Sequence, residues 1–139
     1  MGYVRTMALA LVGALVGALA GVAAAGAGEA DVVGVEAKAE SGGVWRFDVT
    51  VAHGDTGWDH YADKWDVVGP DGKVLGTRVL LHPHEAEQPF TRSLGGIVIP
   101  PDVTEVTVRA HDSVHEYGGR EMTVPLPRCR ASAQSRPIR

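Results

Sequence analysis

Hydrophobic and polar residues alternate along most of the chain after residue 30, in short stretches separated by glycine, proline and aspartate. The clearest stretch runs from Val44 to Val51, where Trp45, Phe47 and Val49 alternate with polar side chains. A period of two predicts a half-buried β-strand. Six weaker stretches predict further strands: Val32 to Lys38, Tyr61 to Val68, Val74 to Leu81, Phe90 to Ile99, Val103 to Ala110 and Glu121 to Leu126.

No stretch of this part of the chain has the period of a helix, so the pattern predicts an all-β fold. Seven strands in about 100 residues favour a two-sheet β-sandwich of the immunoglobulin or fibronectin type III kind. We expect this sandwich to span residues 29–127, with Trp45 and Trp65 as its central core aromatics. No cysteine pair can link the sheets, which makes an antibody-type domain unexpected.

The first 27 residues have the pattern of a signal peptide. Arg5 gives a positive start, an apolar stretch runs from Met7 to about Ala25, and small residues offer cleavage sites at Ala23-Ala24-Ala25 or Ala25-Gly26-Ala27. We therefore expect a periplasmic or secreted protein with no stable membrane span in its mature form. A retained anchor is the alternative, because a stretch of roughly 20 apolar residues can span a bilayer.

Charge separates the expected domain from a short tail. Residues 29–127 carry all 17 acidic side chains and only eight of the 13 Lys and Arg side chains. Their net charge is therefore −9 with histidine neutral. This disfavours nucleic acid and anionic lipid as partners and favours cations, although solubility alone also explains it. Cys129, the single cysteine, lies in a basic tail over residues 128–139 that we expect to be disordered.

Six histidines lie at or near the ends of predicted strands, with acidic residues beside them. Because successive strands of an antiparallel sandwich reverse direction, these chain ends should meet at one end of the domain, among loops that often bind ligands. The histidines are His53, His60, His82, His84, His111 and His115, and their acidic neighbours are Asp55, Asp59, Glu85, Asp112 and Glu116.

The segment His82-Pro83-His84 is the strongest metal-binding signal among them. Side chains two apart in an extended segment point to one side, and Pro83 favours that geometry. Two such imidazoles can chelate Zn²⁺ or Cu²⁺ with one or two further ligands. We expect binding to weaken below about pH 6, as imidazoles protonate.

The predicted metal site therefore has two anchor ligands and several candidates for the remaining positions. His82 and His84 are the anchors, and His60 and His111 are the next choices, ahead of His53 and His115. Asp59, Glu85 and Asp112 are candidate carboxylate ligands, or partners that orient the imidazoles. The leading ligand set is His82, His84, His60, His111, Glu85 and Asp59.

Two other functions compete with metal binding. The histidines could form a metal-free hydrogen-bonded network in a structural or protein-interaction module of the periplasm. An enzyme is not expected. His111-Asp112-Ser113 has the residue types of a catalytic triad, but contiguous residues of an extended chain point to alternating sides, and no nucleophile elbow is present.

Four phrases of the chain resemble a family of small, uncharacterised exported bacterial proteins with an immunoglobulin- or fibronectin-like sandwich domain. The resemblance covers most of residues 29–127 and implies an exported single domain, and it implies no activity. The phrases are Gly57 to Trp65, Leu81 to Glu85, Glu87 to Leu94 and His111 to Gly119.

Overall fold

The computed structural model describes residues 28–127 of the 139-residue chain. The predicted leader over residues 1–27 and the tail over residues 128–139, with Cys129, lie outside the described residues. The described part holds seven strands and no helix, and so no helix with the length and hydrophobicity needed to cross a bilayer. The strands are β1 (Asp31–Ala39), β2 (Val44–Ala52), β3 (Ala62–Val68), β4 (Val74–Val79), β5 (Phe90–Val98), β6 (Glu105–Asp112) and β7 (Met122–Pro125).

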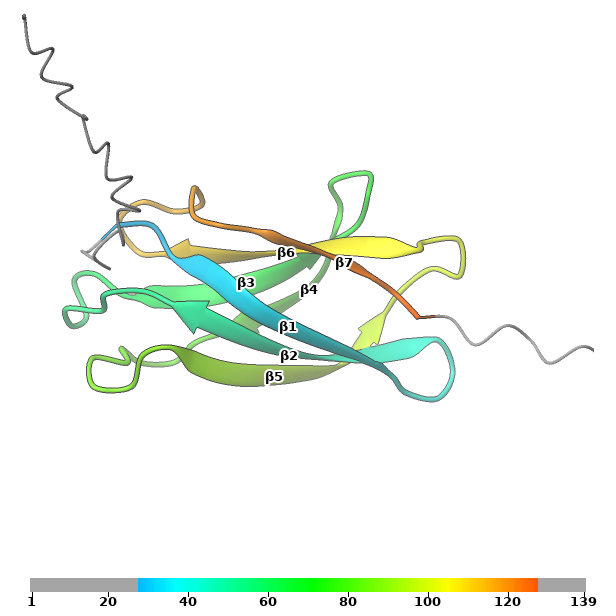
Figure 1. The fold of residues 1–139 in the computed structure, drawn as a ribbon, viewed down its shortest axis with the longest axis horizontal. Helices are drawn as coiled ribbons and strands as arrows, with labels where there is room; N and C mark the ends of the chain where they lie inside the picture. The colour runs from blue at the N-terminus through cyan, green and yellow to red at the C-terminus, as the bar shows by residue number, and fades with distance from the viewer. Residues whose placement is uncertain (1–27, 128–139) are drawn as a thin grey trace, which may run out of the picture.

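The strands form two antiparallel sheets packed face to face (Figure 1). One sheet has the order β1-β2-β5 and the other the order β4-β3-β6-β7. This arrangement confirms the predicted all-β class and the two-sheet sandwich. Each strand begins and ends within two residues of its predicted bounds. The alternation of residues and the turn residues are local features of the sequence, and tertiary packing did not change the strand bounds that they predict.

The core lies between the sheets and is built from the inward-facing positions of the alternating pattern. Phe47, Trp65 and Phe90 are its largest fully buried side chains. Burying side chains of this size contributes about 1.5–3 kcal/mol each to folding. In β6, Val106 and Val108 point inward as the alternation predicts, and they pack in the same core cluster.

A buried carboxylate on the outer face of the four-stranded sheet holds the loop between β6 and β7. Asp66 accepts hydrogen bonds from Thr77 Oγ1 at 2.7 Å, Arg109 Nε at 3.3 Å and Tyr117 Oη at 2.5 Å. Burial works to raise the pKa of Asp66, but the hydrogen bonds from Tyr117, Thr77 and Arg109 outweigh burial and hold the pKa below its usual value. Tyr117 lies in the β6–β7 loop, so this bond fixes one side of that loop.

The lowered pKa of Asp66 predicts a loss of stability in acid. Its folded-state pKa lies below the unfolded value of about 3.9, so its stabilising effect is present above about pH 4. That effect is lost as the pH falls through the folded-state pKa. We expect the free energy of unfolding, measured with urea, to fall more on acidification from pH 7 to pH 3 for the wild type than for Asp66→Asn. The exposed Asp102→Asn variant should follow the wild type, and equal slopes for all three proteins would contradict the prediction.

Candidate metal centre

The six histidines lie at one end of the sandwich, which we call the histidine pole. It consists of the β2–β3 connection, the β4–β5 connection and the end of β6 with its following loop, and these segments gather at the left of Figure 1. Residues 28–30, which lead into β1, are at the same end. The sequence prediction of a shared pole is thus confirmed, and contacts link five of the histidines through shared carboxylates or ring contacts.

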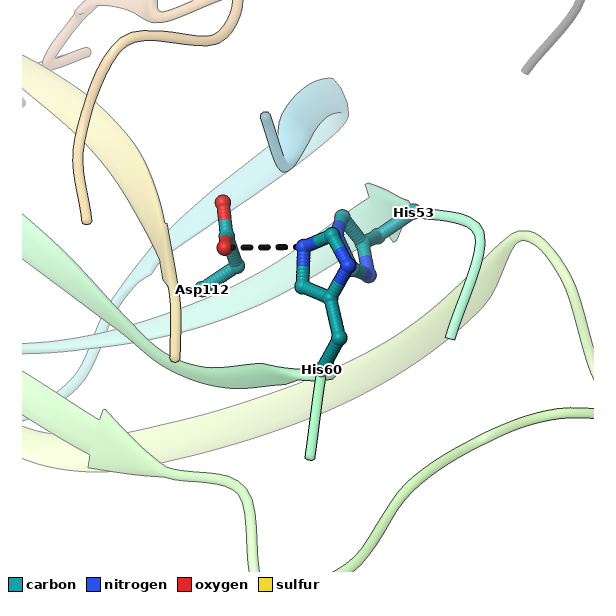
Figure 2. Close-up of side chains that lie close together, drawn as sticks. All are labelled: His53, His60 and Asp112. Carbon is teal, nitrogen blue, oxygen red and sulfur yellow. Dashed lines mark hydrogen bonds and ion pairs between the residues drawn. The ribbon is translucent and has the colours of Figure 1, made fainter. Parts of the chain in front are cut away.

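Three side chains meet inside the pole, two from the β2–β3 connection and one from the end of β6: His53, His60 and Asp112, here called the pole cluster (Figure 2). The Nε2 atoms of His53 and His60 are 3.3 Å apart, and His60 Nε2 is 3.1 Å from Asp112 Oδ1. One potential ligand atom from each of the three lies within 4.8 Å of the others. The side chains of His53 and Asp112 are fully buried, and that of His60 is 13% exposed, so the cluster is closed to bulk water on most sides.

Each cluster residue is positioned by a local feature of the chain. His53 directly follows β2, on the inward side that also carries Val51. His60 stands at the end of a tight turn, in which Gly57 has a φ of 121° and its carbonyl accepts from the His60 amide at 3.2 Å. Asp112 is the last residue of β6 and is paired through backbone hydrogen bonds with Glu116.

Asp55 orients His53 toward the cluster. His53 Nδ1 donates to Asp55 Oδ1 at 2.5 Å, so the other ring nitrogen of His53 faces His60. The fully buried carboxylate of Asp55 also accepts from the backbone amides of Ala62 at 3.1 Å and His84 at 2.7 Å. A carboxylate that holds the far nitrogen of an imidazole is the usual supporting partner of a metal-binding histidine.

Asp112 is held as a carboxylate in spite of its burial. Burial works to raise its pKa, but backbone hydrogen bonds from His115 at 2.7 Å and Val114 at 2.9 Å, with the nearby His53 and His115, lower the pKa below its usual value. These contacts and the contact from His60 all reach Oδ1. Among residues 28–127, no donor reaches the buried Oδ2 atom, so the carboxylate retains capacity to bind a further group.

His115 stands at the mouth of the cluster. Its Nδ1 is 3.2 Å from Asp112 Oδ1, its ring centroid is 4.9 Å from that of His60, and its side chain is 35% exposed. His115 is therefore the side chain that separates the cluster from solvent on this side.

His82 and His84 lie side by side, as their spacing predicts, but away from the pole cluster. Their ring centroids are 4.5 Å apart. His84 is stacked on Phe90 at 3.9 Å, and its Nε2 accepts from Arg92 at 2.9 Å. Burial lowers the pKa of His84, and the charge of Arg92 lowers it further. His82 is exposed, with Nδ1 against the Pro83 carbonyl.

The other predicted ligands also lie outside the cluster. His111 points to the outer face of its sheet, where Nδ1 is 2.5 Å from Asp63 Oδ1 and the ring meets Tyr117 edge-on. Asp59 and Glu85 are exposed. Of the six leading candidates, the structure brings His60 alone into the pole cluster. The sequence placed His53 and Asp112 among the secondary candidates and gave no specific role to Asp55.

Comparison with known proteins finds a relative in sequence and a similar solved structure. No protein-family profile matches the chain. A protein named "Putative lipoprotein" from the archaeon Halomicrobium mukohataei is 47% identical over 96 residues, which make up 69% of this chain and 47% of that protein. The chain thus spans about half the length of this relative, which is archaeal, whereas the resemblance in sequence indicated bacterial proteins. A crystal structure of a hypothetical protein from Pyrococcus horikoshii OT3 is similar at a TM-score of 0.48 and 15% identity, covering 74% of this chain and 94% of that one.

Proposed function

We propose that the chain is an exported β-sandwich module that binds a divalent transition metal ion, Zn²⁺ or Cu²⁺, at the pole cluster of His53, His60 and Asp112. The observation that carries the proposal is the separation of the potential ligand atoms. Two ligand atoms about 2.0–2.1 Å from a tetrahedral ion lie about 3.3–3.4 Å apart. The 3.3 Å between the two Nε2 atoms and the 3.1 Å from His60 Nε2 to Asp112 Oδ1 are close to this spacing.

The chemistry of the donor set supports a borderline cation. Two imidazoles and one carboxylate suit Zn²⁺ and Cu²⁺ better than the hard ions Mg²⁺ and Ca²⁺, which prefer oxygen ligands alone. The supporting contacts are also present, because Asp55 fixes the ring of His53 and two backbone amides fix Asp112. A net charge of −9 over residues 29–127 favours any cation in addition.

An ion at this position would join the two sheets. His53 follows β2 of the three-stranded sheet, whereas His60 precedes β3 and Asp112 ends β6 of the four-stranded sheet. The chain has one cysteine and so no internal disulfide to do this. A metal ion that binds only the folded state, and whose free concentration is a hundred times its Kd, stabilises the fold by about 2.7 kcal/mol. The ion would thus cross-link the two sheets.

The contacts of Ser113, which follows Asp112 in the chain, do not support a serine nucleophile at the pole. Ser113 Oγ accepts from the Tyr61 amide at 3.1 Å and lies 3.5 Å from the Asp59 carbonyl, and no hydrogen bond joins it to a histidine within residues 28–127. A serine nucleophile needs a general base within hydrogen-bond reach. We therefore propose a binding module and not a serine hydrolase.

Export is inferred from the leader pattern and from the relative. The apolar stretch from Met7 to Ala25 has the features of a signal peptide, and the archaeal relative is named as a lipoprotein. A periplasmic or secreted location, and membership of the immunoglobulin or fibronectin type III class of sandwiches, remain predictions. The observed strand orders β1-β2-β5 and β4-β3-β6-β7 are compatible with that class.

Calorimetric titration with Zn²⁺ and Cu²⁺ at pH 7.5 tests the proposed site. We expect one ion per chain for the wild type and a loss of affinity of about 100-fold or more for His60→Ala, because a direct ligand contributes more than a supporting residue. His60 is the best position for the variant, because it is less buried than His53. Circular dichroism should show that His60→Ala remains folded.

The double variant His82→Ala/His84→Ala is the matched control, because it removes two imidazoles of the same pole outside the cluster. It should bind the ion as the wild type does. If this variant loses binding and His60→Ala retains it, the ion sits at the site expected from sequence and the pole cluster is the wrong location.

A second candidate function is a metal-free module that contacts a partner protein through the histidine pole. It is favoured by large apolar side chains exposed near the pole, of which Trp58 is 67% exposed and Leu81 and Val114 are also exposed. Absence of heat with either ion, in a protein shown to be folded, would favour this function over the first.

A further inference from the structure

The backbone at the start of the domain contacts His53 Nε2, the atom that the proposed site offers to the ion. The carbonyl oxygen of Gly28 lies 2.9 Å from His53 Nε2. His53 Nε2 therefore faces two neighbours, the Gly28 carbonyl and the Nε2 atom of His60 at 3.3 Å. An ion bound to His53 would have the Gly28 carbonyl directly beside it.

Residues after Gly28 are held firmly against the β6–β7 loop. The Asp31 carboxylate accepts from the Arg120 amide at 2.6 Å, and the Val32 amide donates to the Arg120 carbonyl at 2.8 Å. Ala30 is buried, and its backbone packs so closely on Gly119 that a Cβ atom there would overlap it. The Gly28 carbonyl is thus two residues from a fixed point and cannot move far from the cluster.

We propose that the Gly28 carbonyl oxygen is a further ligand of the ion, so that metal binding fixes the point where residues 1–27 join the domain. This inference rests on the proposed metal site. Backbone carbonyls bind Ca²⁺ in proteins. The Gly28 carbonyl oxygen is 2.9 Å from His53 Nε2, so a movement of about 0.4–0.5 Å would give the spacing of about 3.3–3.4 Å between neighbouring ligands of a tetrahedral ion. The ion would then connect residue 28, at the start of the sandwich domain, to both sheets.

His115 is the competing source of this ligand. Its Nδ1 contacts Asp112 and its ring lies against His60, whereas the Gly28 carbonyl contacts His53 itself. A site completed by His115 would leave residues 28–30 unaffected by the ion. Both predicted cleavage points of the leader, after Ala25 and after Ala27, precede Gly28, so the carbonyl is present whether or not the leader is removed.

Hydrogen exchange of the full chain with and without Zn²⁺ tests this inference. We expect the amides of residues 29–32 to exchange at least about tenfold more slowly with zinc, since a ligand bond must break before this segment opens. Slowing should persist in His115→Ala. Unchanged or faster exchange at residues 29–32, with stoichiometric zinc binding in the calorimeter, would overturn the role of Gly28 and leave the metal site intact. Absence of zinc binding would instead overturn the proposed function.

An insertion gives a second test that does not depend on exchange rates. Two residues, Gly-Ser, placed between Glu29 and Ala30 would move Gly28 away from His53 while the contacts of Asp31 remain. We expect a loss of zinc affinity on the order of tenfold. The same insertion between Gly42 and Gly43, in the β1–β2 turn at the opposite end, is the control and should leave the affinity unchanged. Equal affinities for all three proteins would contradict the proposal.

Discussion

Replacing Asp55 by alanine is expected to lower the free energy of unfolding by about 3–5 kcal/mol, because three buried donors lose their acceptor at a cost of at least about 1 kcal/mol each. The carboxylate is buried and accepts from His53 Nδ1 and from the amides of Ala62 and His84. Without it, all three donors remain buried and lose their acceptor. Urea unfolding at pH 7 measures the change directly.

The same variant should also weaken zinc binding by about 10–100-fold, because His53 loses the contact that orients its ring. Asp59→Ala is the matched control: this carboxylate belongs to the same connection but is exposed, so its removal should change stability by no more than about 0.5 kcal/mol. If both variants have wild-type stability and affinity, Asp55 does not support the cluster.

Trp65→Ala is expected to have a comparable effect on stability for a different reason. Trp65 has no exposed surface and lies in the centre of the core, between the two sheets. Replacing a buried tryptophan by alanine removes apolar burial and leaves a cavity, at a cost of about 3–5 kcal/mol. The variant's unfolding midpoint in urea should fall accordingly, or the protein should fail to fold.

Trp58→Ala separates core packing from the general loss of a tryptophan. Trp58 is 67% exposed and contacts Tyr61 edge-on in the β2–β3 connection. We expect its replacement to cost less than about 0.5 kcal/mol. A Trp58→Ala variant as unstable as Trp65→Ala would mean that the β2–β3 connection, and not the core, limits stability.

The fold could be predicted from the sequence because its signals are local. Alternation in Val44 to Val51 gives the strand β2, and the Asp71-Gly72 pair gives the β3–β4 turn, where Gly72 has a φ of 82°. The pair Gly95-Gly96 marks a local irregularity in the same way, because β5 has one extra residue there, opposite the stretch of β2 between Trp45 and Phe47. Strand direction then follows from the order of turns, and this placed the histidines at one pole.

The membership of the cluster was harder to predict, because it depends on which way each side chain points at a strand end. His53 continues the inward series of Val49 and Val51, and Asp112 continues that of Val108 and Ala110. Extending the period of two by one position in β2 and β6 would have identified both. By the same rule His111 points outward, where its ring contacts Asp63 and Tyr117.

The roles of Asp55 and of Gly28 could not be predicted by extending the strand periodicity. Asp55 lies in a connection without periodicity. Its burial depends on hydrogen bonds that it accepts from the backbone amides of Ala62 in β3 and His84 in the distant β4–β5 connection. Gly28 contacts His53 through a backbone oxygen, which any residue type would supply. Contacts of these two kinds depend on tertiary structure and leave no residue pattern.

A crystal structure of the protein grown with Zn²⁺, with diffraction data collected on both sides of the zinc absorption edge, tests the central claim most directly. The account predicts one anomalous peak per chain within about 2.0–2.2 Å of His53 Nε2, His60 Nε2 and an Asp112 carboxylate oxygen. A peak bound to His82 or His84, or an anomalous map with no peak at the pole, would contradict it.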